Sequence, residues 1–342
     1  MQRVSRRRFM QTVGALSATA ATTTLLPRVA NAQPAEFTLK YGNNMTDSHP
    51  TNIRAKQAAD AIRRDTNGRV DLQIFPNSQM GSDSDMISQV RAGALDFTSQ
   101  GGGLLSPLVP LAGISGLGFA FKDYPQLWSA LDGDLGQMIR AAISKAGLVV
   151  MDTCWDNGFR HITSSTKPIV TPDDLKGFKI RVPVSPMYVT LFKSLGASPT
   201  SINLSEAYSA LQTRVVDGHE NPLSLIQNLR MYEVQKFCSL TAHMWDGYWF
   251  IGNAQTWARL PKDVQAIVSR HLNAAGAAQR ADLAKLNVEL EKQLTTEGLK
   301  FNRPDREPFR AVAQKSGFYA DWHKRFGDEA WAVLEKYTGK LA

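Results

Sequence analysis

The chain reads WDNGFRHIT over residues 155–163 and GFKIRVP over residues 177–183. Each segment places one arginine, Arg160 or Arg181, among apolar side chains that are typical of a buried strand. Burying a guanidinium costs free energy unless an anion compensates its charge, and its paired donors match the two oxygens of a carboxylate. The segments therefore predict either a clamp for a carboxylate ligand or structural ion pairs with Asp or Glu. The residues leave both interpretations open for Arg181 and favour the ion pair for Arg160.

Strand and helix patterns alternate along the rest of the chain. Short apolar or alternating runs predict strands, and apolar residues three or four apart predict helices. The predicted strands cover residues 37–41, 70–74, 95–97, 148–154, 179–182, 237–241 and 248–251. The predicted helices cover residues 50–64, 124–145, 261–296 and 308–341, with others capped by Ser84 and Thr171 and opened by Ser205. This order predicts an α/β protein with a mainly parallel sheet and helices on both of its faces.

The predicted helix over residues 261–296 is interrupted only by Gly276 and exceeds the usual length of a globular helix. A helix of this length can span two domains. About 310 residues remain after residues 1–32, which is enough for two domains with substantial cores. No linker separates the two α/β halves, so we expect the chain to cross between them more than once. We expect lobe 1 to comprise residues 33–157 with 247–286, and lobe 2 to comprise residues 158–246 with 287–342.

The N-terminal segment has the pattern of an export signal. Residues 5–10 read SRRRFM, a weakly apolar run follows over residues 13–26, and residues 30–32 offer a small-residue cleavage site. The run is too short and too rich in Ala and Thr to be a good membrane span. We expect residues 1–32 to be a twin-arginine signal peptide that directs a folded protein to the periplasm. A basic, disordered tail is the alternative.

The net charge of the mature chain does not favour a nucleic-acid partner. The full chain has 39 basic and 31 acidic side chains, a formal net charge of +8. Five of the basic residues lie in residues 1–32, so 34 remain against 31 acidic ones, a net charge of +3. Most of the basic excess therefore belongs to the predicted signal. We expect neither nucleic-acid binding nor a polybasic membrane surface.

The sequence lacks the motifs of the common metal, hydrolase and phosphate sites. His219 and His243 have no H-x-x-x-H or C-x-x-C partner, so we expect no metal. There is no G-x-S-x-G motif, and the three glycines over residues 101–103 do not form a phosphate-loop pattern. We therefore expect no cofactor. Cys154 and Cys238 are the two cysteines, and we expect buried free thiols rather than a disulfide, although sequence does not show whether they meet.

Two further groups of residues could take part in a site. Glu220 and Asn221 follow a turn-like Asp-Gly pair, and the Asn amide suits a ligand with hydroxyl and carboxylate oxygens. An Asx turn before Pro222 is the alternative. In the aromatic run over residues 243–250, strand alternation places Trp245 and Trp249 on one face and Tyr248 on the other. Core packing is the favoured role of most of these aromatic residues, and one could line an apolar pocket.

The middle of the chain resembles the extracytoplasmic solute receptors of TRAP transporters, the DctP family. The resemblance rests on an ordered series of motifs and extends over nearly the whole mature chain. The motifs are NGFR over residues 157–160, DLKGFKIRVP over 174–183, LGASPT over 195–200, SEAYSALQT over 205–213 and DGHENP over 217–222. A weaker match is FPNSQMG over residues 75–81. Two positions depart from the family pattern: His219, where Gln is usual, and Arg214, where Gly is frequent.

The resemblance implies a two-lobed periplasmic binding protein with crossing hinge strands and a long helix that spans both lobes. It also implies that Arg181 forms the main salt bridge to a ligand carboxylate, with added hydrogen bonds from Arg160 and Asn221. The other expected ligand-binding residues are Asn44, Asp83, Gln100 and Gly101 of the first lobe, together with Glu220, Trp245 and Tyr248.

By the same resemblance, the protein is expected to be a monomeric receptor that performs no chemistry. It would capture a small organic acid anion and deliver it to a permease made of a small and a large membrane subunit. The low charge of residues 99–103 weakens the case for a second strong carboxylate or a sugar acid. Because Trp245, Tyr248 and Trp249 lie close in sequence to the expected crossing between the lobes, we expect a small monocarboxylate with an apolar or aromatic body, such as a keto or hydroxy acid. A C4-dicarboxylate, a periplasmic enzyme acting on an organic acid, and a receptor that feeds a sensor kinase remain as alternatives.

Overall fold

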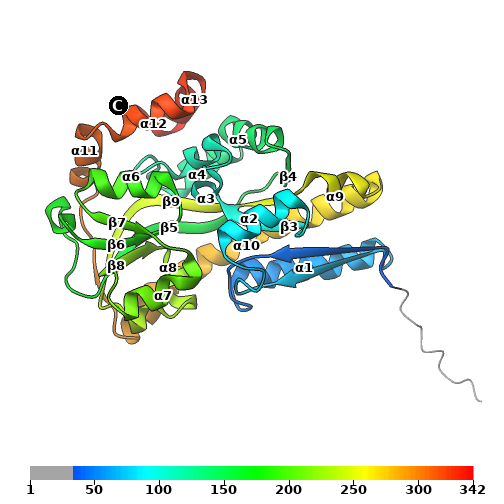
Figure 1. Ribbon diagram of the computed structural model, residues 1–342, viewed down its shortest axis with the longest axis horizontal. Coiled ribbons are helices and arrows are strands. Elements are labelled where there is room, and N and C mark those ends of the chain that lie inside the picture. The colour runs from blue at the N-terminus through cyan, green and yellow to red at the C-terminus, as the bar shows by residue number, and fades with distance from the viewer. Residues whose placement is uncertain (1–33, 342) are drawn as a thin grey trace, which may run out of the picture. The chain divides into compact units, whose positions relative to one another are not determined.

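A computed structural model describes residues 34–341, and the predicted signal peptide over residues 1–32 lies outside the described residues. The chain from Ala35 onward forms one compact unit around a ten-stranded sheet of order β2-β1-β3-β9-β5-β8-β6-β7, with β4 and β10 also paired to β9 (Figure 1). The strands are β1 (Phe37–Gly42), β2 (Val70–Phe75), β3 (Phe97–Gly101), β4 (Leu148–Val150), β5 (Trp155–Ser164), β6 (Lys179–Val182), β7 (Ser198–Ser201), β8 (Gly218–Asn221), β9 (Phe237–Asn253) and β10 (Lys300–Asn302).

Helices follow most of the strands, which gives the mixed α/β fold that the sequence predicts. The longer helices are α1 (Pro50–Asp65), α2 (Asp83–Ala92), α4 (Tyr124–Leu131), α5 (Asp134–Lys145), α6 (Pro186–Ser194), α7 (Leu204–Gln212), α10 (Lys262–Thr296), α11 (Glu307–Lys315), α12 (Phe318–Phe326) and α13 (Asp328–Thr338). The short ones are α3 (Gly102–Leu105), α8 (Leu223–Asn228), α9 (Ala254–Arg259) and the 3-10 turns η1 (Pro110–Gly116), η2 (Pro172–Leu175) and η3 (Met231–Glu233). None of the helices described is long and apolar enough to span a membrane.

The sheet is parallel in its outer parts and antiparallel at its centre. β2, β1 and β3 run parallel to one another, and so do β7, β6 and β8. Between these two groups, β9 pairs antiparallel with β3 and β5, and β5 pairs antiparallel with β8. The outer groups are the parallel βαβ units expected from the alternating pattern. The central strands β5 and β9 connect one group to the other.

β9 is one strand of 17 residues, whereas the sequence predicts two strands over 237–241 and 248–251. The expectation of a break was wrong because β5 supplies partners to the intervening segment, where Gly158, Phe159 and Arg160 face residues 244–246. The local irregularity is nevertheless present. Ala242 has a positive φ of 41°, and the register between β5 and β9 shifts at two points.

Other predicted elements also differ in their bounds. The strand predicted over residues 95–97 is β3, which extends to Gly101, and the single helix predicted over residues 308–341 is divided into α11, α12 and α13 at Gly317 and Gly327. The helix predicted over residues 124–145 is divided into α4 and α5, because Gly133 adopts an extended conformation between them. The strand predicted over residues 148–154 ends at Val150. Ser82, not Ser84, caps α2, and its hydroxyl and backbone form a capping box with Asp85. Thr171 does cap the next predicted helix, but that element is the single 3-10 turn η2.

The apolar core forms two clusters, and alternation along β9 assigns them to the two faces of the sheet. Trp249 and Ile251 belong to the cluster that includes α2, α4–α6 and α11–α13. Tyr248 and Phe250 belong to the cluster that includes α1, α7, α8 and α10. Trp245 lies with Trp249, as predicted. Both cysteines of the chain are buried free thiols, and burial raises the pKa of each thiol.

Helix α10 packs against α1 and β5, and two contacts fix its position on β5. The side-chain amide of Gln279 accepts from the backbone of Asp156 at 2.9 Å and donates to the carbonyl of the same residue at 2.7 Å. One turn earlier, Gly276 lies against the indole of Trp155, at a place where a Cβ would come within 2.7 Å of the ring nitrogen. The glycine that interrupts the helical pattern is therefore required by a close helix–strand contact.

We expect Gly276→Ala to lower the free energy of unfolding by up to about 2 kcal/mol. Overpacking against Trp155 costs about 1–3 kcal/mol, which outweighs the gain in helix propensity of about 1 kcal/mol. Urea denaturation of the two proteins measures the difference. Ala277→Gly, on the exposed side of the same helix, calibrates the propensity term. A Gly276→Ala protein more stable than the parent would contradict this explanation of the glycine.

Candidate functional site

A small cavity lies where the central strands meet the first residues of α2 and the loop after β1. Its volume is about 20 Å³, room for a water molecule, so an organic ligand enters only if the walls move apart. Its lining comprises Asn44, Asp83, Leu104, Asn157, Arg160, Arg181, Pro183, Leu204, Asn221, Leu225, Asp246 and Tyr248. The lining thus comes from segments between residues 44 and 248 that lie far apart in the sequence, and only the fold brings these segments together.

Arg181 is the cation of this cavity that has no acidic partner. It lies on β6 with only 2% of its surface exposed, and its Nε donates to the carbonyl of Ile202 at 2.8 Å. Its Nη1 has no hydrogen-bond partner, and no carboxylate of the described residues forms an ion pair with it. Burial lowers the pKa of Arg181 to about 10, so the side chain still carries its charge at neutral pH. The charges of Glu220 and Asp83 stabilise this guanidinium only from beyond ion-pair distance. A buried guanidinium without a direct anionic partner is costly, and an anionic ligand would compensate it.

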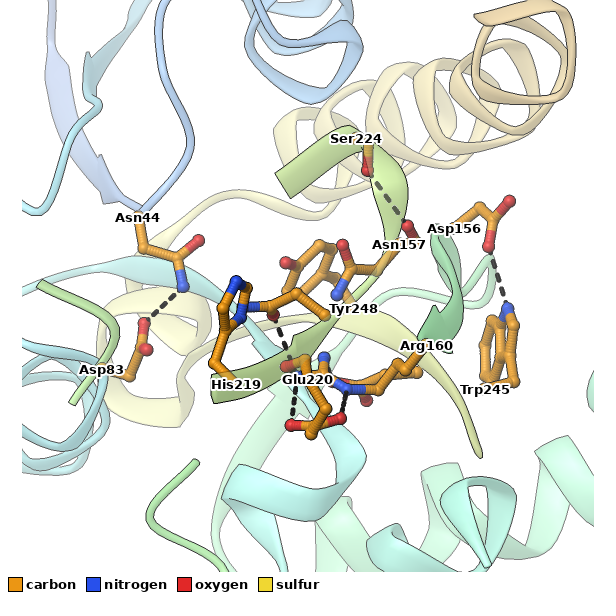
Figure 2. Close-up of polar contacts among 12 residues, drawn as sticks. Asn44, Asp83, Asp156, Asn157, Arg160, His219, Glu220, Ser224, Trp245 and Tyr248 are labelled. Atoms are coloured by element: carbon orange, nitrogen blue, oxygen red, sulfur yellow. Dashed lines mark hydrogen bonds and ion pairs between the residues drawn. The ribbon is translucent and has the colours of Figure 1, made fainter. Parts of the chain in front are cut away.

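Arg160 is compensated within the protein. Its Nε donates to Oε2 of Glu220 at 2.5 Å, and its Nη2 donates to Oε1 of Glu220 at 2.7 Å and to Oδ1 of Asn221 at 2.9 Å (Figure 2). Burial opposes the charged form of both groups, but their mutual attraction is stronger. The pKa of Arg160 is raised, and the pKa of Glu220 is lowered to about 2. This is the structural ion pair that the residues favour for Arg160, although its guanidinium also lines the cavity.

Two acids and two amides present oxygens to the cavity. The Nδ2 of Asn44 donates to Asp83 at 2.8 Å, which leaves the Oδ1 of Asn44 buried without a partner (Figure 2). The Oδ1 of Asn157 is likewise unpartnered. Asp246 lies 3.5 Å from Nη1 of Arg160. Burial raises the pKa of both Asp83 and Asp246 to about 6, against the attraction of Arg181 for the first and Arg160 for the second.

The structure brings together six of the ten residues that the sequence proposes as ligand-binding. These are Arg181, Arg160, Asn221, Asn44, Asp83 and Tyr248, which all line the cavity. The remaining four, Gln100, Gly101, Glu220 and Trp245, are buried but do not appear in its lining.

Three of these four residues lie against residues of the cavity lining, and the fourth packs in the apolar core. Glu220 holds Arg160, and Gln100 contributes a hydrogen bond that lowers the pKa of Asp83. Gly101 leaves room for a neighbour, because a Cβ there would lie 2.6 Å from Oδ2 of Asp246. The indole of Trp245 donates to Asp156 at 2.9 Å and packs edge-on against Trp128, so it belongs to the apolar core rather than to the cavity (Figure 2).

Sequence reasoning missed two polar residues of the cavity, Asn157 and Asp246. Asn157 opens the NGFR motif, so the motif itself offered the signal. Asp246 lies in the aromatic run over residues 243–250. The aromatic residues around it indicate core packing, and nothing in the run marks the acid as part of a binding site. The apolar members Leu104, Pro183, Leu204 and Leu225 carried no signal.

His219, which replaces the usual Gln of the resembled family, supports Asn221. Burial lowers the pKa of His219 to about 3, so the imidazole is neutral, and its Nδ1 lies 3.0 Å from Nδ2 of Asn221. Because the amide nitrogen of Asn221 faces Nδ1 of His219, Nδ1 accepts its hydrogen bond. The amide oxygen of Asn221 is thereby left to accept from Arg160. Within the described residues, no group of His, Cys, Asp or Glu is arranged to hold a metal ion.

The fold and this cavity define a solute-binding protein of the two-lobed periplasmic type. Residues 41–320 match the family of bacterial extracellular solute-binding proteins, family 7, known as DctP. The chain therefore belongs to the DctP family, and the resemblance stated from its motifs is confirmed.

Two relatives illustrate the similarity in sequence. The sialic acid-binding periplasmic protein SiaP of Vibrio cholerae is 34% identical over 82% of this chain and 87% of its own length. The uncharacterized protein y4mM of Sinorhizobium fredii is 36% identical over 84% of this chain. The chain spans only about half of that second protein, 52% of its length.

Two solved structures illustrate the similarity in fold. A TRAP periplasmic solute-binding protein from Sulfurospirillum deleyianum with bound succinate superposes with a TM-score of 0.83 at 31% identity, covering 89% of this chain and 99% of that one. A TRAP periplasmic solute-binding protein from Polaromonas sp. JS666 bound to D-erythronate gives a TM-score of 0.84 at 29% identity, covering 89% and 100%. The predicted fold class is thus confirmed.

Opposite effects on stability are expected from removing the two arginine charges. In the ligand-free protein, Arg181→Met replaces an unpaired buried charge with an apolar chain of similar length and should raise the free energy of unfolding by about 1–4 kcal/mol. Arg160→Met leaves Glu220 unpaired and should lower it by about 3–5 kcal/mol. Urea denaturation after dialysis against ligand-free buffer measures both. Equal destabilisation by the two changes would mean that Arg181 is also a structural cation.

Asp83 should make the ligand-free protein less stable as the pH rises. Because burial raises its pKa from 3.8 to about 6, the folded chain holds this proton more tightly than the unfolded chain does. The resulting stabilisation is complete below about pH 4 and is lost as the pH rises through about 6. Asp83→Asn should therefore gain about 2 kcal/mol relative to the parent between about pH 4.5 and 7.5. Asp173→Asn, at the surface, is the matched control, and a pH-independent difference for Asp83→Asn would refute the argument.

Proposed function

We propose that this chain is the periplasmic receptor of a TRAP transporter and that it captures a small organic acid anion through Arg181. One observation carries the proposal: a buried guanidinium that lines the cavity and has an unpartnered Nη1. A structural ion pair at Arg181 has less support, because Glu220 is already bonded to Arg160 and Asp83 attracts Arg181 without forming an ion pair with it. A ligand carboxylate would provide the missing anion.

The ligands of related proteins support this chemistry. By their descriptions, the relative from Vibrio cholerae binds sialic acid, and the two solved structures hold succinate and D-erythronate. All three ligands are carboxylates, and their bodies differ widely. A shared carboxylate site with a variable remainder fits a cavity in which Arg181 has an unpartnered donor and the rest of the lining mixes amides, acids, leucines, a proline, a tyrosine and the paired Arg160.

For the ligand itself we propose a keto or hydroxy monocarboxylate. The aromatic body considered from the sequence has less support, because Tyr248 is the one aromatic residue among the lining residues and Trp245 packs elsewhere. A C4-dicarboxylate is the second candidate, and the succinate complex of the related structure favours it.

We further propose that two lobes close over the ligand by hinge motion. The lobes are residues 33–157 with 247–286, and residues 158–246 with 287–342. The first register shift between β5 and β9 lies where the chain crosses between the lobes, and the second shift and the positive φ of Ala242 lie within five residues of a crossing. We propose that these points absorb the rotation. The ligand would stabilise the closed form because residues of both lobes contact it.

In this proposal the receptor works as a monomer in the periplasm, after export by the twin-arginine signal. The closed form delivers its cargo to a permease of one small and one large membrane subunit. The receptor itself performs no chemistry, so the ligand leaves unchanged. Mass spectrometry of an organic acid after incubation with the protein should therefore detect the same molecule, and a new product would identify an enzyme instead.

We expect Arg181→Ala to weaken binding by about 2–5 kcal/mol, which corresponds to roughly 30-fold to several thousand-fold. A thermal-shift screen over organic acids first selects a ligand, because a molecule that binds only the folded state raises the melting temperature. Isothermal titration calorimetry of that acid then compares the parent with Arg181→Ala. Arg214→Ala, on the surface, is the control and should bind as the parent does. Unchanged affinity in Arg181→Ala would exclude the clamp.

A further inference from the structure

A second cavity lies near the C-terminal end of the chain, where the segment before α4 meets the start of α11 and the end of α13. Its volume is about 260 Å³, against about 20 Å³ for the cavity between the central strands, and the two cavities share no lining residue. Four of its lining residues are basic, namely Lys122, Arg306, Arg310 and Lys340, and one, Glu307, is acidic. The proposed capture of an organic acid between the central strands gives this cavity no role.

The basic residues of this second cavity are only partly neutralised by the protein. Lys340 forms an ion pair with an acid of α13, and the guanidinium of Arg310 lies 3.6 Å from the carboxylate of Glu307. Among the described residues, no carboxylate lies within ion-pair distance of Lys122 or Arg306. The lining therefore holds two positive charges that have no acidic partner in the described part of the chain.

Main-chain carbonyls hold the two guanidinium groups in place. Nη2 of Arg306 donates to the carbonyl of Phe121 at 2.9 Å, and Nη2 of Arg310 donates to the carbonyl of Lys340 at 2.9 Å. These bonds give both arginines a structural role, because they join α11 to the segment before α4 and to the end of α13. A carbonyl carries only a partial charge, and Nε of each guanidinium has no hydrogen-bond partner. The carbonyls therefore position the two cations without neutralising them.

Burial makes the charge of Arg306 costly to leave unpaired. It lowers the pKa of Arg306, against the attraction of Glu307. The buried residues Phe119, Ala120 and Thr338 contribute to the same lining. The helix dipoles do not set the sign of the cavity, because the start of α11 favours an anion and the end of α13 favours a cation. The unpaired basic side chains are therefore what makes the cavity positive.

We propose that this cavity is a second binding site, which takes a small doubly charged oxyanion such as phosphate or sulfate between Lys122, Arg306 and Arg310. Two unpaired positive charges match a dianion, and a planar guanidinium presents paired donors to its oxygens. A lipid headgroup is the other source of a phosphate, but attraction to anionic lipid takes clusters of about 4–8 basic residues. A free ion fits the two unpaired cations better. The site does not depend on which organic acid the receptor captures.

Isothermal titration calorimetry with sodium phosphate and with sodium sulfate, at constant ionic strength and neutral pH, tests the site. We expect one ion to bind per chain with a Kd on the order of 1 mM or below. Acetate and chloride should bind at least about 10-fold more weakly, because they offer one charge to two unpaired cations and lose at least one charge-assisted hydrogen bond.

Two exposed lysines provide a matched pair of variants. Lys122→Glu reverses one charge of the lining and should weaken phosphate binding at least about 10-fold. Lys145→Glu is the same change at an exposed lysine outside the lining, and it should bind phosphate as the parent does. Arg306→Gln should abolish measurable binding. If Arg306→Gln does not fold, the lysine pair still decides the question.

Arg181→Ala separates this site from the cavity between the central strands. Phosphate binding that survives Arg181→Ala and falls in Lys122→Glu supports the second site, whichever organic acid the receptor captures. Loss of phosphate binding in Arg181→Ala but not in Lys122→Glu would place the ion in the first cavity and overturn the inference. If neither phosphate nor sulfate binds, the inference fails and the proposed function stands. Binding to phosphatidylglycerol vesicles without binding of free phosphate would make the cavity a membrane contact, which also overturns the assignment.

Discussion

The ion pair between Arg160 and Glu220 decides which of the two buried arginines is available to a ligand. Both carboxylate oxygens of Glu220, and its backbone carbonyl, accept from Arg160 of β5. The same carboxylate lies 3.1 Å from the imidazole of His243, so one acid joins β5, β8 and β9. Since this acid is fully engaged, Arg181 on the neighbouring strand β6 keeps an unpartnered donor. The central sheet thus fixes the charge pattern of the cavity as well as the position of its walls.

Local signals were enough to predict most of the fold. The spacing of apolar residues predicts the ends of α1 and α10 to within one or two residues. Helix caps and turns depend on neighbouring residues, so a local pattern also indicates them. β9 could not be predicted as one strand, because β5 supplies the partners that carry its backbone through the Asp246-Gly247 pair. That partner lies about 90 residues away along the chain. The division between α4 and α5 falls at Gly133, where a Cβ would lie 2.5 Å from the hydroxyl oxygen of the distant Tyr337.

The sequence predicts which kinds of residue form the candidate site, but not how these residues are arranged. An arginine in an apolar segment signals that an anion must be near, yet only the fold shows whether that anion belongs to the protein. For Arg160 it is Glu220, which lies 60 residues further along. For Arg181 the described residues provide none. The lining of the cavity is a still longer-range feature, because Asn44 and Asp246 are separated by about 200 residues along the chain and line the same cavity only in the folded protein.

The two thiols bear on where this protein can fold. Cys154 and Cys238 lie in different core clusters and do not bridge. Burial keeps both sulfurs protonated and therefore poorly reactive toward oxidants. No oxidation step is needed to complete the native structure, so the chain can mature in the reducing cytoplasm where it is synthesised. Folding before export is what the twin-arginine signal proposed for residues 1–32 would require.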